Sequence, residues 1–362
     1  FNAGATYTKK EGAMKGSSRE NWGGNLVISY RKGRLNITEN LMLQGSKGIE
    51  SPYGNFATFA AANPYYRKTD ENGFINRQLD PVYDTSEINP LYNASLYSIN
   101  QNKGFGFTNN LRGIFTLTNS LQLEAGLAAG KNNSDAVVFI PPDNTLFDGV
   151  EANKKGSYTS AKTETKTVNA YAAISYGQMI GKGRLSANIR GNIESTTNEM
   201  LGFTAIGFPY GTNGNPSYAY GYAPATRPAS SRVTSRGAGI ASSINYMYDN
   251  RYGIDLVYTL SGASAFGSNK RYKPFYSAGA SWNINREGFF RNISWINSLR
   301  LRGNIGYSGN QNLGNFTSVS TYAYQSTSSN YFGQGLALQS LGSPDLEWSK
   351  TLNGSYGLEF SL

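Results

Sequence analysis

The sequence predicts an all-β fold, an antiparallel transmembrane β-barrel, from three observations. Many long segments alternate between apolar and polar residues, short turns alternate with long polar connections, and aromatic residues gather near the ends of the apolar faces. Side chains of a strand point alternately to its two faces, so each such segment has one apolar and one polar face. Alternation over about ten residues is typical of strands that cross a membrane.

The alternating segments number about 12, and their length exceeds that of ordinary soluble strands. In the segment 120–131, for example, Leu121, Leu123 and Leu127 alternate with polar residues. Clear examples, in chain order, are 22–31, 34–47, 104–117, 120–131, 185–194, 232–248, 251–264, 298–310 and 352–362.

The connections between these segments are of two kinds. Tight hairpins are predicted at Lys32-Gly33, Thr118-Asn119 and Asp249-Asn250, which are turn-forming residue pairs. Long connections rich in Asn, Gly, Pro, Tyr and Ser are predicted near 48–103, 132–162, 198–231 and 310–350. This regular alternation is typical of an outer-membrane barrel, with short turns at the periplasmic end and long loops at the extracellular end.

The composition excludes several classes of protein. The chain has no Cys and no His, which excludes disulfides, thiolate or imidazole metal sites and Ser-His-Asp hydrolysis. We find no catalytic constellation, so we expect no enzyme, no cofactor and no metal. The net charge of +10 favours contact with outer-membrane lipid and the phosphates of lipopolysaccharide. No block of Lys and Arg is present, so no nucleic-acid partner is expected.

Aromatic residues on the apolar faces, among them Trp22, Tyr30, Trp282 and Phe360, are predicted to form interfacial girdles. Ordinary cross-strand packing is the alternative interpretation. Glu39 departs from the pattern, because it shares parity with the apolar residues of segment 34–47. A β-bulge near 38–40, or a position close to the membrane edge, would remove the cost of a lipid-facing carboxylate.

The chain begins and stops inside strand-like runs, "FNAGATYTKK" and "YGLEFSL". An unpaired strand edge is not tolerated in lipid. We therefore expect either that the first and last strands pair, or that these strands are part of a larger barrel.

Three stretches carry a resemblance to a known family. They are "EGAMKGSSRENWGGNLVIS", "AFGSNKRYKPFYSAGASWNINREGFF" with "INSLRLRGNIGYSGNQNLGNF", and "LGSPDLEWSKTLNGSYGLEFSL". They resemble the barrel of SusC-like TonB-dependent outer-membrane transporters, most strongly across 263–362 and more weakly at 1–45. The resemblance implies a barrel of about 22 strands, a plug domain that is absent from this chain, and location in the bacterial outer membrane. It also implies import of glycans or peptides, with TonB acting through the plug and a SusD-like lipoprotein at the extracellular mouth.

Parity assigns a set of charged and amide residues to the polar face, which is predicted to line the barrel lumen. These residues are Arg31, Asn188, Arg190, Glu194, Arg300, Arg302 and Asn304. Aromatic residues of the long connections are candidates for contact with a ligand or partner, with self-packing of the loops as the alternative. The candidates are Tyr65, Tyr66, Tyr210, Tyr218 and Tyr220.

Three further expectations concern single segments and the function as a whole. The basic segment "GSNKRYK" (267–273) is either a lipopolysaccharide contact or a solvated loop tip, and Trp348 is expected at the membrane interface. The alternative functions are a passive outer-membrane pore, which requires pairing of the terminal strands, and a barrel scaffold in a secretion or assembly complex.

Overall fold

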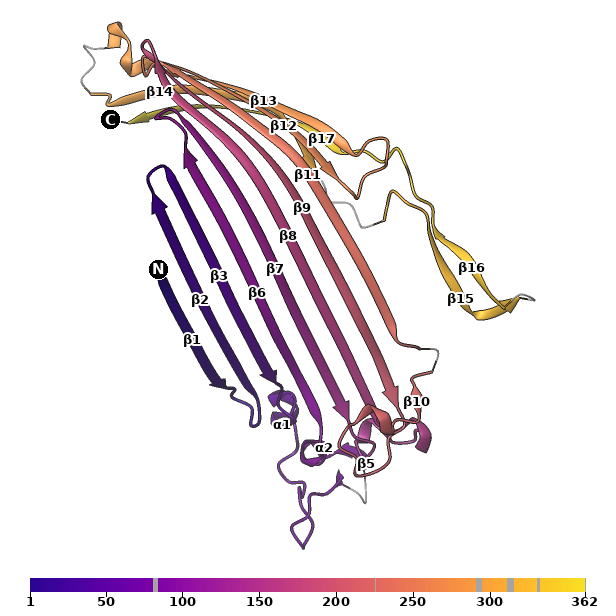
Figure 1. Ribbon diagram of the computed structural model, residues 1–362. Coiled ribbons are helices and arrows are strands. Elements are labelled where there is room, and N and C mark those ends of the chain that lie inside the picture. Colours follow the sequence, from indigo (N-terminus) through magenta and orange to yellow (C-terminus); the bar gives the residue numbers. More distant parts are fainter. Residues whose placement is uncertain (81–83, 225, 291–294, 311–315, 331–332, 362) are drawn as a thin grey trace.

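The computed structural model describes residues 1–362 except 81–83, 225, 291–294, 311–315, 331–332 and 362, and it confirms the predicted all-β fold (Figure 1). Residues 311–315 of the stretch "INSLRLRGNIGYSGNQNLGNF" therefore lie outside the described residues. The main sheet of the described residues has 13 strands and is antiparallel throughout. No helix in the described ranges has the length and apolarity needed to cross a membrane.

Twelve strands follow one another along the main sheet, each paired with the next. They are β1 (Asn2–Glu11), β2 (Ser18–Lys32), β3 (Leu35–Ile49), β6 (Ile99–Thr116), β7 (Leu121–Ile140), β8 (Ser157–Ile180), β9 (Gly183–Ile206), β11 (Ala229–Tyr248), β12 (Tyr252–Ala263), β13 (Tyr272–Asn283), β14 (Ser298–Asn310) and β17 (Ser349–Ser361). The short strand β10 (Gly221–Tyr222) pairs with β9.

The smaller elements lie in the connections between the main strands. They are α1 (Phe56–Ala60), β4 (Gln78–Asp80), β5 (Asp84–Ile88), α2 (Pro90–Ser95), the hairpin of β15 (Thr321–Asn330) with β16 (Gly333–Ser340), and the 3-10 turns η1 (Thr145–Phe147), η2 (Ala152–Lys154), η3 (Pro216–Tyr218), η4 (Ile284–Arg286) and η5 (Gly288–Phe290).

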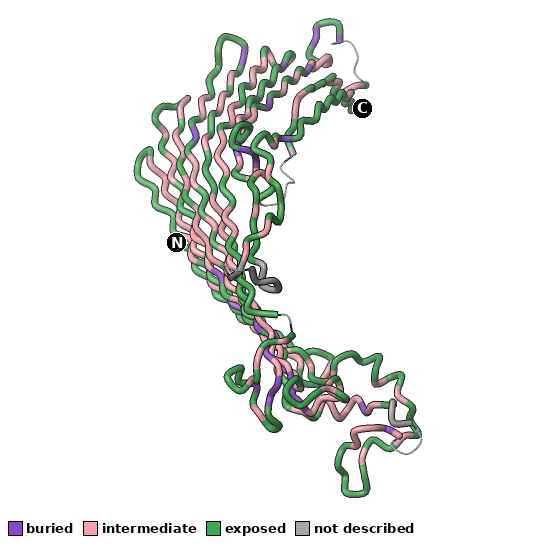
Figure 2. Tube along the Cα trace, turned by 90° about the vertical axis from the view of Figure 1, so that its right-hand side faces the viewer, coloured by how far each residue is buried: buried purple, intermediate pink, exposed green. Residues whose placement is uncertain are grey.

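The main sheet is strongly curved and open, with β1 at one edge and β17 at the other (Figures 1 and 2). Among the described residues, β1 pairs only with β2, and β17 pairs only with β14. The closed 12-stranded barrel, one of the two expected outcomes, requires β1 to pair with β17. The structure does not contain that pairing.

The chain reverses at all three predicted hairpins, but the turn residues differ from those predicted: residues 33–34 connect β2 with β3, residues 117–120 connect β6 with β7, and residues 249–251 connect β11 with β12. The β2–β3 turn uses Gly33 at a φ of 57°, and the β11–β12 turn uses Asp249 and Asn250 at φ of 49° and 52°. Positive φ at both central residues matches the twist of a two-residue hairpin, and Asn and Asp tolerate it better than other non-glycine residues. These turns fix the register of the long strands on both sides.

At the other end, the strands continue well into the segments predicted as long connections. β7 extends to Ile140 and β8 begins at Ser157, so only 141–156 connects them, whereas a connection near 132–162 was expected. The pairing remains one-to-one up to Ile140 opposite Ser157. In β7 the extra residues are a polar run, 132–135, followed by an apolar run, 136–140, so sequence alternation no longer marks them as strand although the backbone ladder continues.

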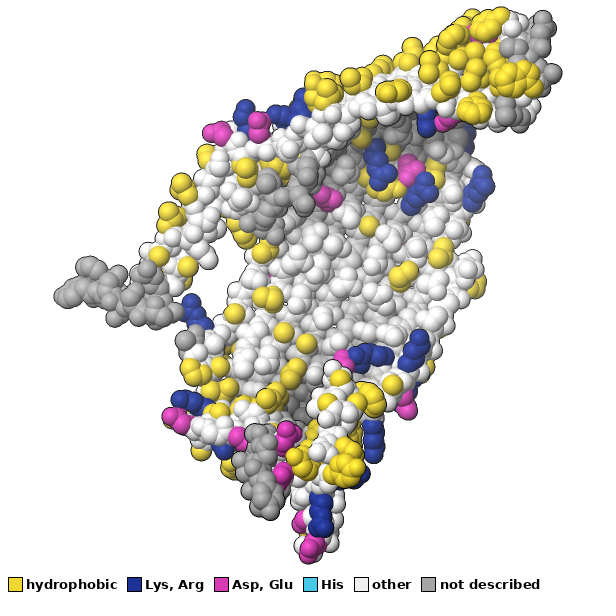
Figure 3. Space-filling view, turned by 180° about the vertical axis from the view of Figure 1, so that it is seen from behind, with side chains coloured by type: hydrophobic (Ala, Val, Ile, Leu, Met, Phe, Trp, Pro, Cys, Tyr) yellow, Lys and Arg dark blue, Asp and Glu magenta, His cyan; other side chains and the backbone are white. Residues whose placement is uncertain are grey.

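The register aligns all apolar faces on the convex side of the sheet. Leu41 of β3 lies opposite Leu26 of β2, and Ile174 of β8 lies between Leu123 of β7 and Ile189 of β9. Large apolar side chains of this face are exposed, as expected for a surface whose solvent is lipid rather than water. The concave face, which Figure 3 views, is mainly uncharged and polar, with a few charged groups.

The turn between β13 and β14 is held by a nearly buried carboxylate. Glu287 Oε1 accepts hydrogen bonds from the Tyr252 hydroxyl at 2.6 Å and the Trp282 indole N–H at 3.0 Å, and Arg251 donates to Oε2 at 3.4 Å. The bonds from Tyr252 and Trp282, with the Arg251 charge, lower the pKa of Glu287 against a smaller opposing effect of burial. This contact gives the stretch "SWNINREGFF" a structural role.

Glu39 lies on the convex face in the middle of β3, and no bulge surrounds it. It pairs regularly with Ile28 of β2 and Leu111 of β6, so the expected bulge is absent. The carboxylate is half-buried and accepts a hydrogen bond from the side-chain amide of Asn109, on the same face of β6. A polar partner, rather than an irregular backbone, accommodates this residue.

We predict that Asn109→Leu lowers the free energy of unfolding by about 1–3 kcal/mol, because Glu39 loses its donor on an apolar face. The double variant E39L/N109L is expected to be at least as stable as the unmodified protein, since both polar groups are then removed from the lipid face. Denaturant unfolding in detergent micelles measures both values. A stability of Asn109→Leu equal to that of the unmodified protein would contradict a stabilising hydrogen bond between Asn109 and Glu39.

We predict that Glu287→Gln destabilises the protein at neutral pH and removes part of its acid sensitivity. The folded pKa of Glu287 lies below its ordinary value near 4.5, so its contribution is present above that pH and is lost as pH falls through the lower folded value. Unfolding measured from pH 7 down to acid conditions tests this, with exposed Glu71→Gln as the control. Parallel pH profiles for the unmodified and E287Q proteins would contradict the assignment.

Candidate functional site

The residues predicted for the polar face all lie on strands of the main sheet, on the face opposite the apolar residues. Arg31 lies on β2, Asn188, Arg190 and Glu194 lie on β9, and Arg300, Arg302 and Asn304 lie on β14. Strands β11, β12 and β13 separate the β9 group from the β14 group, and Arg31 is remote from both. The predicted residues therefore form separate groups on the concave face.

The main cluster of the concave face joins four neighbouring strands, β6 to β9. Arg112 donates from Nε and a terminal nitrogen to the two oxygens of Glu124, at 2.9 and 2.8 Å. The Tyr171 hydroxyl donates to the same carboxylate at 2.6 Å, and the Arg190 guanidinium lies 3.7 Å from the Tyr171 ring centroid. The ion-paired Glu124 and the cation–π contact with Arg190 thus hold the Tyr171 ring in place on the concave face.

The local sequence makes room for this cluster. Gly126 lies directly opposite Tyr171, and a Cβ atom at position 126 would be 2.3 Å from a carbon of the ring. Only glycine allows the aromatic side chain to lie flat against the neighbouring strand. Of this cluster only Arg190 was predictable from the sequence; the association of Arg112, Glu124 and Tyr171 depends on the register of four strands.

A second group of contacts connects β14 with β17 on the same face. Arg302 forms an ion pair with Glu359 at 2.9 Å, and the Ser355 hydroxyl donates to Asn304 at 2.8 Å. The Nε atom of Arg300 is buried and has no hydrogen-bond partner among the described residues. On this face of β14, Arg302 and Asn304 therefore have partners on β17, whereas the Nε donor of Arg300 has none among the described residues.

A hollow of about 680 Å³ lies at the loop end of β1, β2, β3 and β6, lined chiefly by residues of the concave face. Its polar lining includes Asn21, Asn25, Asn40, Gln44 and Asn132, and glycines form part of its floor. Carboxamides both donate and accept hydrogen bonds. The hollow is therefore suited to uncharged polar groups such as hydroxyls and amides.

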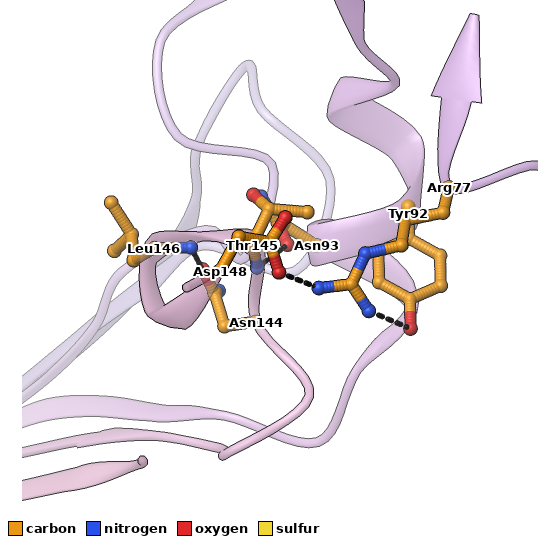
Figure 4. A network of polar contacts seen from close by, with 7 residues as sticks. All are labelled: Arg77, Tyr92, Asn93, Asn144, Thr145, Leu146 and Asp148. Atoms are coloured by element: carbon orange, nitrogen blue, oxygen red, sulfur yellow. Dashed lines mark hydrogen bonds and ion pairs between the residues drawn. The ribbon is translucent and has the colours of Figure 1, made fainter. Parts of the chain in front are cut away.

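Contacts between separate connections order the loop end of the sheet (Figure 4). Arg77 forms an ion pair with Asp148 and lies 5.2 Å from the ring centroid of Tyr92. The side-chain amide of Asn93 donates to the Thr145 hydroxyl at 2.7 Å, and its oxygen accepts from the Thr145 backbone N–H at 3.1 Å. The long connection before β6 is thereby tied to the segment that follows β7.

Two phenylalanines, one at the end of β7 and one in the connection after β9, form the core beneath this layer. Phe139 and Phe208 are almost fully buried, with ring centroids 5.2 Å apart in an edge-to-face arrangement. Ala205 completes the buried cluster. The connection after β9 is thus packed against the end of β7.

The predicted loop tyrosines remain mostly at the surface. Tyr65 is 91% exposed and Tyr220 is 77% exposed; Tyr210 and Tyr218 are also exposed, and Tyr66 is half-buried. These exposed rings lie on two different connections, 50–98 and 207–228, and are available for contact with other molecules.

The basic segment 267–273 is held against the segment that precedes β17. Lys273 forms an ion pair with Glu347 at 2.7 Å, which lowers the pKa of that carboxyl, and Asn269 donates to Asp345 at 2.9 Å. Trp348 is 4% exposed and stacks on Phe266, with ring centroids 4.2 Å apart. The expectation that Trp348 lies at the membrane interface was therefore wrong, because the ring closes a local core.

The described residues contain no group of three or more His, Cys, Asp or Glu side chains placed to hold a metal ion. The arrangement of this face offers paired charges, amides, hydroxyls and aromatic rings. Such a surface can guide and hold polar molecules.

Comparison with known proteins identifies similar chains. No protein-family model matches the chain. It is 27% identical over 325 residues to TonB-dependent receptor P26 of Formosa agariphila, which covers 86% of this chain and 31% of that relative. It is 29% identical over 124 residues to TonB-dependent receptor SusC of Bacteroides thetaiotaomicron, which covers 33% of this chain and 12% of that relative.

Among solved structures, that of the RagAB peptide transporter aligns with a TM-score of 0.79 and 21% identity, over 98% of this chain and 40% of that chain. This chain spans about a third of the length of receptor P26. The comparisons confirm the predicted resemblance to SusC-like TonB-dependent outer-membrane transporters, the barrel fold and the outer-membrane location. The similar proteins are receptors and a transporter.

We predict that Glu124→Ala lowers the free energy of unfolding by about 1 kcal/mol, because Arg112 loses a bidentate partner and Tyr171 loses its acceptor on a partly exposed face. Glu194→Ala is the matched control. Glu194 is exposed on the same face and forms no ion pair among the described residues, so its loss is expected to change stability by less than about 0.5 kcal/mol. Equal effects of the two substitutions in denaturant unfolding would contradict a stabilising role for the cluster.

Proposed function

We propose that this chain is part of the wall of a TonB-coupled outer-membrane importer that takes up oligomeric polar nutrients, either glycans or peptides. The observation that carries the proposal is the 27% identity to a TonB-dependent receptor over 86% of the chain. The two-faced sheet supports it, because a convex apolar face and a concave polar face are what a transporter wall requires.

In this proposal the concave face lines the lumen. Arg31, Asn188, Glu194, Arg300 and the Arg190–Tyr171 pair contribute to a wet wall that contacts the plug and the moving substrate. In this proposal a plug domain outside this chain links the barrel to TonB.

At the extracellular end we place a SusD-like lipoprotein. The exposed rings of Tyr65, Tyr210 and Tyr220 support this placement, together with the ordered loop layer around Asp148 on which a partner can rest. Aromatic rings of this kind also stack on sugar rings. The amide-lined hollow at the loop end suits hydroxyls and peptide groups alike, so it favours neither nutrient class.

Uptake measurements test the proposal. In the native organism, deletion of the complete gene is expected to abolish accumulation of one labelled class of oligosaccharides or peptides, and re-expression is expected to restore it. A protonophore should abolish the restored uptake, because TonB coupling draws on the proton gradient of the inner membrane. Uptake of a monosaccharide small enough for porins serves as the control.

The alternative functions give different results. A passive pore would retain uptake in the presence of the protonophore and would show steady conductance in planar bilayers. A scaffold would leave uptake unchanged and would co-purify with assembly components. Either result would replace the import proposal.

A further inference from the structure

A row of cations lies on the convex face where its apolar band meets the loop end. On seven of the main strands, the next outward position beyond the apolar band in the described residues is Lys or Arg. We call this set the cationic rim: Lys9, Lys47, Lys103, Lys131, Lys166, Arg236 and Lys350. At the turn end the outward strand positions are mostly apolar, as with Leu121, Tyr248 and Tyr252, and Lys32 is a charged exception.

The charges of the rim are only partly neutralised by the protein. Glu164 binds both Lys131, at 2.7 Å, and Lys166, and Glu20 lies 3.9 Å from Lys9. Lys47 and Lys103 lie directly opposite each other on β3 and β6; on their other sides Lys47 lies opposite Glu20 of β2 and Lys103 lies opposite Asp135 of β7. Within the described ranges neither of the two forms an ion pair, and Arg236 forms none either.

An apolar groove of about 590 Å³ runs below the rim on the same face. It crosses β8, β9, β11 and β12, where small side chains leave a depression between larger ones. Its lining includes Ala170, Ala172, Gly191, Ala238 and Leu260. Lys166 lies four residues from Ala170 on β8, and Arg236 lies two residues from Ala238 on β11, so both cations stand at the loop end of the groove.

We propose that this groove, with Lys166 and Arg236, is a binding site for a phosphorylated lipid of the outer leaflet, of the lipid A type. An acyl chain occupies the apolar depression and a phosphate monoester lies between the two cations. The occupant follows from charge complementarity. Glu164 is shared by Lys131 and Lys166, Glu199 opposite Glu164 pairs with Arg232, and Arg236 forms no ion pair in the described ranges. A net positive charge therefore remains at one end of a dry groove, which an amphiphile with an anionic head fits. Thr197 of β9 lies directly opposite Lys166, and Thr234 of β11 lies directly opposite Thr197. The two threonine hydroxyls are 3.0 Å apart and offer further hydrogen bonds.

The site is independent of the import proposal, because it lies on the opposite face of the sheet from the concave wall. The placement of cations at the loop end matches the leaflet that carries phosphorylated glycolipid. A phosphate between Lys166 and Arg236 forms charge-assisted hydrogen bonds, which are about twice as strong as neutral ones.

Native mass spectrometry of the complete protein in detergent tests the site, with bisphosphorylated hexa-acyl lipid A as the probe. K166Q/R236Q is expected to lower the affinity about tenfold by removing both phosphate contacts. Ala170→Phe is expected to lower it by filling the groove while leaving the rim intact. The matched control is R67Q/K68Q, which removes one exposed Arg and one exposed Lys from a loop and should change affinity by less than about twofold.

A lipid A lacking both phosphates separates recognition of the headgroup from general contact with lipid. The proposal expects it to bind the unmodified protein about as weakly as the bisphosphorylated lipid binds K166Q/R236Q. The proposal is overturned if K166Q/R236Q binds as the unmodified protein does, or if the lipid without phosphates binds equally well. It is also overturned if all variants, including A170F, bind alike, since that would mean unspecific annular lipid.

Discussion

The constraint on which this structure depends is that a backbone inside lipid must satisfy its own hydrogen bonds. In the main sheet this is met by unbroken antiparallel ladders that continue one-to-one through all twelve strands. A regular ladder forces a strict two-residue period on side chains, so one face can be mainly apolar and the other mainly polar. Even Glu39 obeys the ladder, and its cost is met by the side chain of Asn109 rather than by a break in pairing.

The same constraint applies at the edges of the sheet. β1 and β17 expose N–H and C=O groups that no strand among the described residues pairs. In a bilayer those groups need partners, and the larger barrel that we propose would supply them on both sides. The open sheet agrees with such a barrel. If its twelve strands closed on themselves, β1 and β17 would be paired, and they are not.

The fold was predictable from sequence because contact with lipid requires a strict alternation of apolar and polar residues along each strand. The strand ends and local cores were not predictable, because segments in water carry no such simple pattern. Alternation identified the strands around Leu123 and Leu301, and turn chemistry identified Gly33 and Asn250. The pattern fades beyond the apolar band, so the ends of β7 and β8 were predicted as loops. Trp348 was misplaced for a related reason: an aromatic residue near a strand end fits either an interface or a local core, and only its neighbour Phe266 decides.

The concave cluster shows the same limit. Parity placed Arg190 on the polar face, but its association with Tyr171 depends on register and on the missing side chain at Gly126. Charge pairing then differs between the faces. Arg112 and Arg302 on the concave face have carboxylate partners within the wall, whereas Lys47 and Lys103 on the convex rim have none in the described ranges. With a net charge of +10, the excess positive charge of the rim lies where the surroundings, not the protein, must supply the anions. The concave face is thus neutralised by carboxylates of the sheet itself, whereas on the convex rim carboxylates of the sheet pair with Lys9, Lys131 and Lys166 but not with Lys47, Lys103 or Arg236 in the described ranges.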